Sequence, residues 1–317
     1  MTKVAIVGVG GMGATHYNLY RDMKDVELTA LVDVEPDRVT ERAAACGARA
    51  YTDMADMLER ETPDIVDICT PSYLHCEQSL AAMEKGCHVI TEKPAGLHRE
   101  DVTRMFRCAE EHHVFFMVAQ VLRFFPEYHW LKNAIASREL GQLLHMNMYR
   151  TGCGPVSCWN GWMFDKEKSG LVPYDLHIHD IDFAVYALGK PDDVRTYELL
   201  GSAGHYVETA LTYGGARVNA KAAWYNGNAP FQMGFDALFE GGYAELANDK
   251  LTLYPNGAGP VDLSSTPVTG GSEINVANTS GYHNELRYFI ECVRAGTAPE
   301  VTKEDELTAV IDILNLY

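Results

Sequence analysis

The chain has little positive charge and no apolar run long enough to cross a bilayer. It holds 26 Lys and Arg against 44 Asp and Glu, which gives a formal net charge of -18. Such a surface repels a phosphate backbone and an anionic membrane, so we expect neither nucleic acid nor a membrane as a partner. The first residues run directly into a short apolar strand without a signal-peptide pattern, and we therefore expect a cytoplasmic protein.

Paired cysteines are also missing. Eight cysteines are scattered along the chain and none forms a Cys-x-x-Cys pair, which favours reduced thiols in the cytosol. Cys153 and Cys158, near His177 and His179, carry zinc-ligand atoms, but their spacing is loose and no second pair matches it. We therefore expect no bound metal.

The chain has enough apolar residues to form two hydrophobic cores. Its 317 residues are more than one ordinary domain contains, and 47% of them are hydrophobic, as in a globular protein. The pattern of elements changes near residue 122, so the predicted fold class is α/β in two domains. Residues 1–122 are expected to form a doubly wound parallel sheet. Residues 123–317 are expected to form an α+β domain with a large, mostly antiparallel open sheet.

Short apolar runs alternate with helical patterns in the first domain, which is typical of a parallel sheet covered by helices on both faces. The predicted strands are Val4–Val7, Leu28–Val32, Ile65–Cys69, His88–Thr91 and Val114–Val118. The alternation continues to about residue 121, where the first domain is expected to end.

A glycine-rich turn follows the first predicted strand, and Ala14–Met23 then has a helical pattern. Strand, glycines and helix in this order give the glycines three tasks: a tight turn, close approach to a pyrophosphate, and helix-to-strand packing. The helix N-terminus also attracts phosphate. The residues of the turn that are predicted to bind a dinucleotide are Gly8, Gly10, Gly11, Met12 and Gly13.

Asp33 ends the second predicted strand, twenty residues beyond Gly13. A carboxylate there accepts hydrogen bonds from the adenosine ribose and disfavours the 2′-phosphate of NADP. Capping of the next helix is the plainer interpretation of Asp33. Arg38 offers a contact to adenine and would weaken the preference for NAD over NADP. Residues 1–122 are therefore predicted to form an NAD(P)-binding Rossmann domain, with NAD as the cofactor and NADP as the alternative.

Two further motifs follow strands of the first domain: a segment from Cys69 to His75, and Glu92-Lys93-Pro94. With the glycine turn they resemble the glucose–fructose oxidoreductase, inositol dehydrogenase and rhizopine-catabolism (Gfo/Idh/MocA) family, and the resemblance covers nearly the whole chain. It implies that Thr70, Pro71 and His75 line the cofactor and that Glu92 lies near the nicotinamide ribose.

Lys93 also has a physical reason to be functional. Open parallel sheets bind ligands beyond the carboxyl ends of their strands, and Lys93 follows such an end. An ammonium group there polarises a substrate oxygen beside the nicotinamide, and Pro94 restricts Lys93 to extended backbone geometry. A surface lysine in a loop is the plainer interpretation.

Strands at hairpin spacing dominate the second domain, after a helix that begins at Pro126. They are Leu143–Tyr149, Val194–Leu200, Val207–Tyr213, Arg217–Trp224, Gln232–Phe239 and Leu251–Tyr254. A sheet with helices on one face leaves its other face for a partner subunit. We therefore expect residues 123–317 to bind substrate and to form a homodimer or homotetramer through this sheet.

An acid–base pair is predicted on a helix that opens at Pro173 and closes at Gly189. Asp175 and His179 are one turn apart, and histidine is the side chain whose pKa suits proton exchange near neutral pH. An ordinary exposed contact is the plainer interpretation of this pair. On a regular helix His177 points off the face that these two share, so we interpret it as structural.

The family resemblance assigns roles to residues of both domains. It implies that His179 is the general acid or base and that Asp175 binds substrate. It also implies substrate contacts for Lys93, Arg123 and Tyr282.

These patterns together predict an NAD(P)-dependent dehydrogenase that acts on CH–OH groups. It would transfer a hydride between nicotinamide and a hydroxyl or carbonyl carbon of a sugar, polyol or inositol-like compound. Two other functions are open to this sequence: an NAD-dependent glycoside hydrolase that uses transient oxidation, and a non-catalytic NAD(P)-binding sensor. A cofactor that never exchanges would favour the hydrolase. A sensor has no need for Lys93, Asp175 and His179 together.

Overall fold

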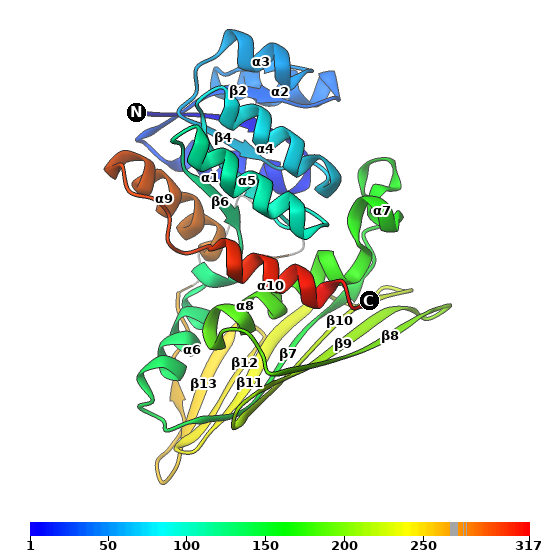
Figure 1. Cartoon of the computed structure of the whole chain (residues 1–317), viewed down its shortest axis with the longest axis vertical. Coiled ribbons are helices and arrows are strands. Elements are labelled where there is room, and N and C mark those ends of the chain that lie inside the picture. Colours follow the sequence, from blue (N-terminus) through cyan, green and yellow to red (C-terminus); the bar gives the residue numbers. More distant parts are fainter. Residues whose placement is uncertain (267–271, 275, 277) are drawn as a thin grey trace. The chain divides into compact units, whose positions relative to one another are not determined.

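The chain divides into two compact units in the computed structural model, which describes residues 1–317 except 267–271, 275 and 277 (Figure 1). One unit comprises Met1–Gln120 with Val268–Glu304, and the other comprises Val121–Pro267 with Asp305–Tyr317. The first change of unit falls close to the expected boundary at residue 122. The return of residues 268–304 to the first unit differs from the expected continuous second domain.

A six-stranded parallel sheet forms the centre of the first unit. Its order is β3-β2-β1-β4-β5-β6, which confirms the predicted doubly wound sheet. The strands are β1 Thr2–Val7, β2 Val26–Val32, β3 Arg49–Tyr51, β4 Ile65–Ile68, β5 His88–Glu92 and β6 Phe116–Ala119. The sequence did not predict β3, because it is short, lies at the edge and has no buried residue to produce an apolar run.

Helices join the strands of the first unit, and sequence features mark several of their ends. Pro36 begins its helix and Gly47, with a φ of 79°, ends it. The Asp53 side chain accepts a hydrogen bond from the backbone N–H of Asp56 and so caps the next helix. The helices are α1 Gly11–Asp22, α2 Pro36–Cys46, α3 Met54–Arg60, α4 His75–Glu84, α5 Arg99–Glu111 and α9 Ser280–Ala295.

Helix α9 comes from the far end of the sequence but belongs to the first unit. Asp25, in the turn before β2, accepts hydrogen bonds from Arg287 at 2.8 and 3.0 Å and pairs also with Arg294. These hydrogen bonds account for the very low pKa of the Asp25 carboxyl group. No periodicity in the sequence marks a pairing over such a separation, which is why the expected second domain included this segment.

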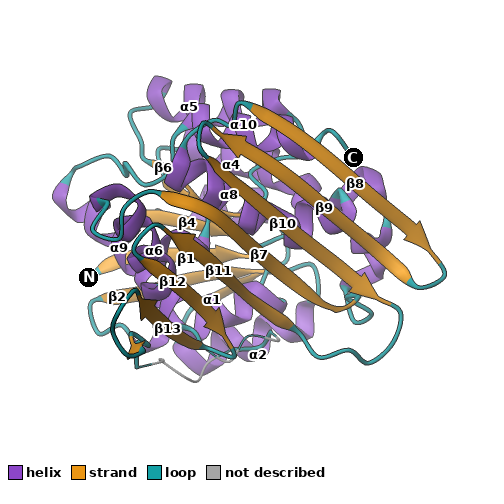
Figure 2. Cartoon of the chain, turned by 90° about the horizontal axis from the view of Figure 1, so that it is seen from below, coloured by secondary structure: helices purple, strands orange, loops and turns teal. Residues whose placement is uncertain are grey.

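An eight-stranded sheet forms the second unit (Figure 2). Its order is β14-β13-β12-β11-β7-β10-β9-β8, and all its pairs are antiparallel except β7 with β10. This confirms the predicted large, mostly antiparallel sheet. The strands are β7 Leu143–Cys153, β8 Asp193–Gly201, β9 Gly204–Tyr213, β10 Ala216–Tyr225, β11 Gln232–Phe239, β12 Gly242–Ala247, β13 Lys250–Pro255 and β14 Val261–Asp262.

Helices pack on one face of this sheet. The ring of Tyr128 lies 5.1 Å from that of Phe183 and 5.3 Å from that of Phe235, which joins two helices to β11. The helical segments are α6 Pro126–Ser137, α7 Lys166–Ser169, α8 Ile178–Leu188 and α10 Glu304–Leu314, with a π-helical turn at Pro173–His177 and 3₁₀ turns at Val121–Phe124 and Trp159–Phe164.

The other face of the sheet carries a row of aromatic side chains. Residues opposite one another in a ladder share a face, and the register places Tyr149 in line with Tyr197, and Tyr243 in line with Tyr254. Tyr197, Leu199 and Tyr254 on this face are exposed. Tyrosine is enriched in protein interfaces, and the expected pairing of subunits through this face stays a prediction.

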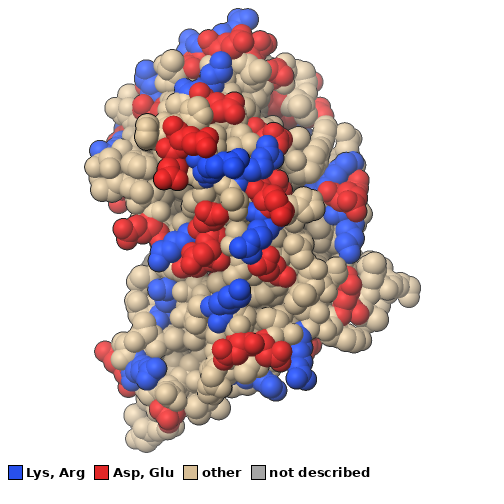
Figure 3. All heavy atoms as spheres, in the orientation of Figure 1, with Lys and Arg blue, Asp and Glu red and all other residues tan. Residues whose placement is uncertain are grey.

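Charged side chains of both signs are interleaved on the face drawn in Figure 3, and no large basic patch is visible there. This distribution accords with the acidic composition of the chain. Among the described residues, no helix is long and apolar enough to cross a membrane.

Arg123 is the buried charge around which the helices of the second unit pack. Its guanidinium donates two hydrogen bonds to Asp182, at 2.9 and 2.7 Å, and one to Glu306 at 2.7 Å. It also lies 4.3 Å from the ring centre of Tyr186. These carboxylates outweigh the effect of burial and raise the pKa of Arg123. The burial and the ion pairs of Arg123 therefore indicate a structural role, which the sequence did not reveal, beside the substrate contact that the resemblance implied.

We predict that Arg123→Ala lowers the free energy of unfolding by about 3–5 kcal/mol, because it leaves the buried Asp182 carboxylate without its cation. Urea unfolding followed by circular dichroism measures the change. Arg195→Ala removes an exposed ion pair with Asp193 and serves as the control, with an expected loss below about 1 kcal/mol. Equal losses in the two variants would contradict the structural role of Arg123.

Candidate functional site

The glycine turn after β1 has the close packing that its sequence predicts. Gly8 has a φ of 86°, and its N–H donates to Val32 O at 2.8 Å. A Cβ on Gly13 would lie 1.8 Å from Gly8 O, whereas a Cβ on Gly10 would meet only the Arg38 side chain at 3.7 Å. The turn and the helix therefore require glycine at positions 8 and 13, and the space beside Gly10 fits the approach of a pyrophosphate.

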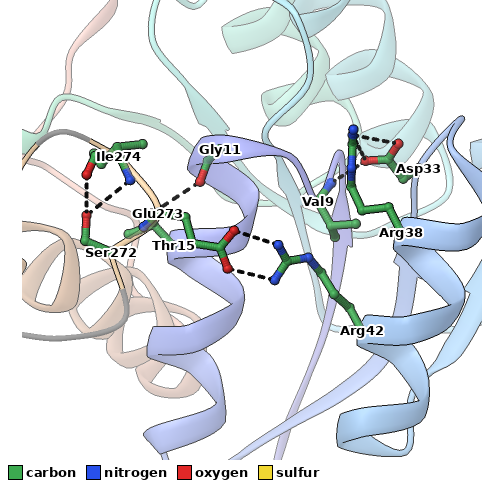
Figure 4. Close-up of polar contacts among 9 residues, drawn as sticks. All are labelled: Val9, Gly11, Thr15, Asp33, Arg38, Arg42, Ser272, Glu273 and Ile274. Carbon is green, nitrogen blue, oxygen red and sulfur yellow. Dashed lines mark hydrogen bonds and ion pairs between the residues drawn. The ribbon is translucent and has the colours of Figure 1, made fainter. Parts of the chain in front are cut away.

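Asp33 follows β2, and its carboxylate is held by the backbone (Figure 4). Its Oδ2 accepts a hydrogen bond from Val9 N–H at 2.9 Å and its Oδ1 accepts one from Glu35 N–H at 3.0 Å. The guanidinium of Arg38 lies 3.3 Å from Oδ2. The carboxylate of Asp33 thus supports the turn before α2 and lies at the end of β2, and its contact with a ribose stays a prediction.

A distant segment lies beside this turn, as Figure 4 shows. Glu273 forms a two-bond ion pair with Arg42 at 3.0 and 2.7 Å, and its N–H donates to Thr15 Oγ1 at 3.1 Å. The hydrogen bond to Arg42 lowers the pKa of Glu273. The methyl Cγ2 of Ile274 lies 3.8 Å from where a Cβ of Gly11 would be. Residues 272–274 therefore form a wall beside the glycine turn that the sequence did not indicate.

The strand ends of β4 and β5 carry the two motifs of the family resemblance. These strands are neighbours in the parallel sheet, so Thr70 and Lys93 follow strand ends on the edge that also carries Gly8 and Asp33. The N–H of Lys93 donates to Glu92 Oε2 at 3.1 Å. The sheet thus brings the predicted cofactor residues of the first unit to one edge.

His75 holds the two motifs together. It is buried, and its Nδ1 lies 2.7 Å from Pro94 O while its Nε2 lies 2.7 Å from Thr70 O. Burial lowers the pKa of His75. Both ring nitrogens face backbone carbonyl groups, so His75 joins the two loops, and its contact with the cofactor stays a prediction.

The predicted acid–base pair lies at the junction of two kinds of helix in the second unit. Asp175 belongs to the π-helical turn and His179 to the first turn of α8, and both side chains are half-buried. Trp224 Nε1 donates to Asp175 Oδ2 at 3.1 Å. π-helical turns are rare and are frequent at functional sites. The sequence predicted the pair, but it predicted neither the π-helical turn nor the contact with Trp224.

His177 lies in the core, as its helical position indicated. Its side chain is buried, and its Nε2 is 2.8 Å from Thr209 Oγ1, which in turn lies 2.6 Å from the hydroxyl of Tyr317. Burial lowers the pKa of His177 to about 3. It is therefore a neutral hydrogen-bonding residue near neutral pH, which suits a structural role.

Tyr282, implied as a substrate contact, lies on α9 in the first unit. Its side chain is buried, and its ring centre is 6.5 Å from that of His16. The structure thus places Lys93 and Tyr282 in the first unit, and Arg123, Asp175 and His179 in the second.

A doubly wound parallel sheet with this glycine turn and this acid defines a dinucleotide-binding protein. The family model described as "Oxidoreductase family, NAD-binding Rossmann fold" matches residues 2–120. The model of the GFO/IDH/MocA C-terminal domain matches residues 128–236. The chain therefore belongs to the Gfo/Idh/MocA oxidoreductase family, which confirms the resemblance and the predicted NAD-binding domain.

Several characterised proteins are similar to the chain. A 2,7-anhydro-N-acetylneuraminate hydratase of Mediterraneibacter gnavus is 31% identical over 191 residues, which is 60% of this chain and 50% of that protein. The matched part spans about half the length of that relative. Myo-inositol 2-dehydrogenase of Thermotoga maritima is 25% identical over 98% of this chain and 93% of its own.

A solved levoglucosan dehydrogenase in complex with NADH and levoglucosan has the same fold. Its TM-score is 0.83 with 21% sequence identity, and the alignment covers 99% of this chain and 95% of that chain.

We predict that Asp33→Asn weakens NAD binding by roughly tenfold to a hundredfold, because a charge-assisted hydrogen bond contributes about 1.5–3 kcal/mol. NADP binding should weaken less, since the carboxylate that disfavours the 2′-phosphate is lost. Calorimetric titration with both cofactors gives the ratio. An unchanged NAD-to-NADP ratio would remove Asp33 from the cofactor site.

Proposed function

We propose that the protein transfers a hydride between NAD and a carbon that bears a hydroxyl or carbonyl group in a sugar, polyol or inositol-like substrate. The observation that carries this proposal is Lys93, which follows β5 on the sheet edge that carries the glycine turn and Asp33. Similarity to an inositol dehydrogenase over nearly the whole chain supports the substrate class.

Three side chains divide the chemistry in this proposal. Bound NAD supplies the hydride acceptor for alcohol oxidation. The ammonium group of Lys93 stabilises charge on the reacting oxygen, and His179 accepts the hydroxyl proton. Asp175, oriented by the indole N–H of Trp224, binds a neighbouring hydroxyl of the substrate. Arg123 and His75 take structural roles, in place of the direct contacts that the resemblance implied.

A lyase-type reaction through transient oxidation is the second candidate, because the chain is 31% identical to an anhydroneuraminate hydratase over 60% of its length. The same three side chains would serve it, since the first step is again an oxidation beside the cofactor. The two reactions differ in one observable: a dehydrogenase releases one NADH for each product, whereas transient oxidation returns the hydride and leaves no net NADH.

We also propose that two copies pair through the tyrosine-bearing face of the eight-stranded sheet, and that the protein works in the cytoplasm with its eight cysteines as free thiols. The sheet face without helices offers exposed Tyr197 and Leu199 on β8 and Tyr254 on β13. Large aromatic side chains on a sheet are suited to an isologous contact between copies.

Replacement of His179 by alanine tests the chemical proposal. We expect kcat to fall about 10²–10⁴-fold because the proton acceptor is lost, while calorimetry shows unchanged NAD binding. The substrate is chosen from a screen of inositols, sugars and polyols with NAD and NADP, followed by the absorbance of reduced nicotinamide. His129→Ala on α6 removes an exposed histidine of the same unit and is the control. Wild-type turnover of His179→Ala would end the assignment.

The oligomer is tested by placing charge on the sheet face. The double variant Tyr197→Glu with Leu199→Glu should convert an oligomer to a monomer in light scattering at micromolar concentration, because buried like charges oppose association. Val156→Glu changes an apolar residue that is exposed and off the sheet, and it should leave the mass unchanged. An oligomer that persists in the double variant would show that another surface is used.

A further inference from the structure

The first unit contains a buried ionic chain that the proposed chemistry does not use. The His16 side chain, on α1, is fully buried, and its Nδ1 lies 2.9 Å from Asp67 Oδ2 on β4. Its Nε2 lies 3.3 Å from Glu92 Oε1 at the end of β5, within ion-pair distance although outside hydrogen-bond geometry. The other oxygen of Glu92 accepts the N–H of Lys93. A continuous path thus leads from Asp67 to Lys93.

The position of His16 between two carboxylates favours its charged form. A neutral imidazole donates from one nitrogen only and would present a lone pair to the second carboxylate. Burial by itself lowers the pKa of His16, but the charge of Asp67 and the hydrogen bond to it outweigh burial, and the pKa is well above its usual value. The imidazolium therefore stabilises the fold below the unfolded-state pKa of about 6.5, and that contribution is lost only as pH rises through the raised folded-state pKa.

The other groups around His16 are acidic or aromatic. Cys69 Sγ lies 3.4 Å from Nδ1, and burial raises the pKa of this thiol so that it stays neutral. Burial and the charge of Asp67 likewise raise the pKa of Tyr20, on α1, with a contribution from Glu285 on α9. The ring of Tyr282 approaches from α9. None of these named groups supplies a positive charge that would oppose an imidazolium.

We propose that His16 is a positioning residue for Lys93: its imidazolium, held by Asp67, fixes the Glu92 carboxylate, which orients the Lys93 backbone. The proposal rests on the proposed function of Lys93. Without the cation, the carboxylates of Asp67 and Glu92 face a buried space with no charge between them, and burial disfavours that state. The Glu92 side chain then rotates away, and the backbone N–H of Lys93 loses its acceptor.

The charge state is tested in the wild-type protein without any substrate. Nitrogen-15 NMR of the histidine-labelled enzyme at pH 8 should show both ring nitrogens of His16 protonated, with the signal assigned by its loss in His16→Gln or, if that variant does not fold, by its shift in Asp67→Asn. A neutral His16 at pH 8 would overturn the proposal. Because this readout does not involve turnover, it remains informative even where the proposed dehydrogenase reaction fails.

The positioning role is tested by a double-mutant cycle on the intact protein with the substrate found in the screen. We expect His16→Gln to lower kcat about tenfold to a hundredfold, as a small displacement of a reacting group does, with NAD affinity within about threefold of wild type. The KM for the substrate should stay close to that of the wild type, because a misplaced Lys93 weakens an interaction made in the transition state. A merely structural role would lower stability and leave kcat per folded molecule unchanged.

Glu92→Gln supplies the other arm of the cycle. If His16 acts through Glu92, the double variant that carries both His16→Gln and Glu92→Gln should have a kcat no lower than that of Glu92→Gln alone. The second substitution then removes nothing that the first has left in place. Losses that multiply in the double variant, or a wild-type kcat in His16→Gln, would overturn the proposal. Thr91→Val is the matched control, because Thr91 is buried beside Glu92 and its hydroxyl has no hydrogen-bond partner among the described residues.

Discussion

The close approach of α1 to the turn after β1 is the constraint on which the first unit depends. Only the absence of a Cβ on Gly13 lets the helix pass the carbonyl oxygen of Gly8 at van der Waals distance. This approach fixes the direction of α1 and so places His16 in the core. It also sets the path of Val9, whose N–H holds Asp33 at the cofactor edge. The cofactor-binding edge of the sheet and the buried side chain of His16 thus both depend on Gly8 and Gly13.

Buried ion pairs occur in both units. Arg123 faces two carboxylates in the second unit, and His16 faces two in the first. Arg150 lies 3.4 Å from Asp180. Asp180 directly follows His179, the proposed proton acceptor, in the sequence. Burial raises the pKa of Asp180 to about 6, and Arg150 opposes this rise. Paired buried ions contribute little net stability, but each partner makes the position of the other hard to change. Such pairs suit the support of reactive groups, because misplacement by about 1 Å slows a reaction.

The sequence predicted what depends on local pattern. Short apolar runs predicted most strands of the first sheet, alternating patterns predicted most strands of the second, and the order of glycines and acid predicted the dinucleotide-binding domain. It did not predict β3, whose residues are too few and too exposed to produce a run. Nor did it predict the pairing of Arg42 with Glu273, which lie 231 residues apart, because sequence periodicity carries no information about such contacts. The π-helical turn at Pro173–His177 has the same composition as an α-helix, so its altered hydrogen bonding was invisible.

The family resemblance assigned roles to residues of both units, but it could not tell which of these side chains the fold itself engages. His75 and Arg123 are buried, and their side chains contact carbonyl and carboxylate groups. Asp175 and His179 keep partial exposure on their helical turns. Burial and hydrogen-bond partners therefore distinguish these two pairs where motif position alone does not.

The proposed hydride transfer requires both Lys93 and His179. A cycle of Lys93→Met, His179→Ala and the double variant, assayed by single turnover with NAD bound, tests this requirement most directly. Residues that act as a unit are strongly non-additive, so we expect the double variant to be no slower than the slower single variant. Losses that multiply, or a Lys93→Met variant with wild-type hydride transfer, would contradict it.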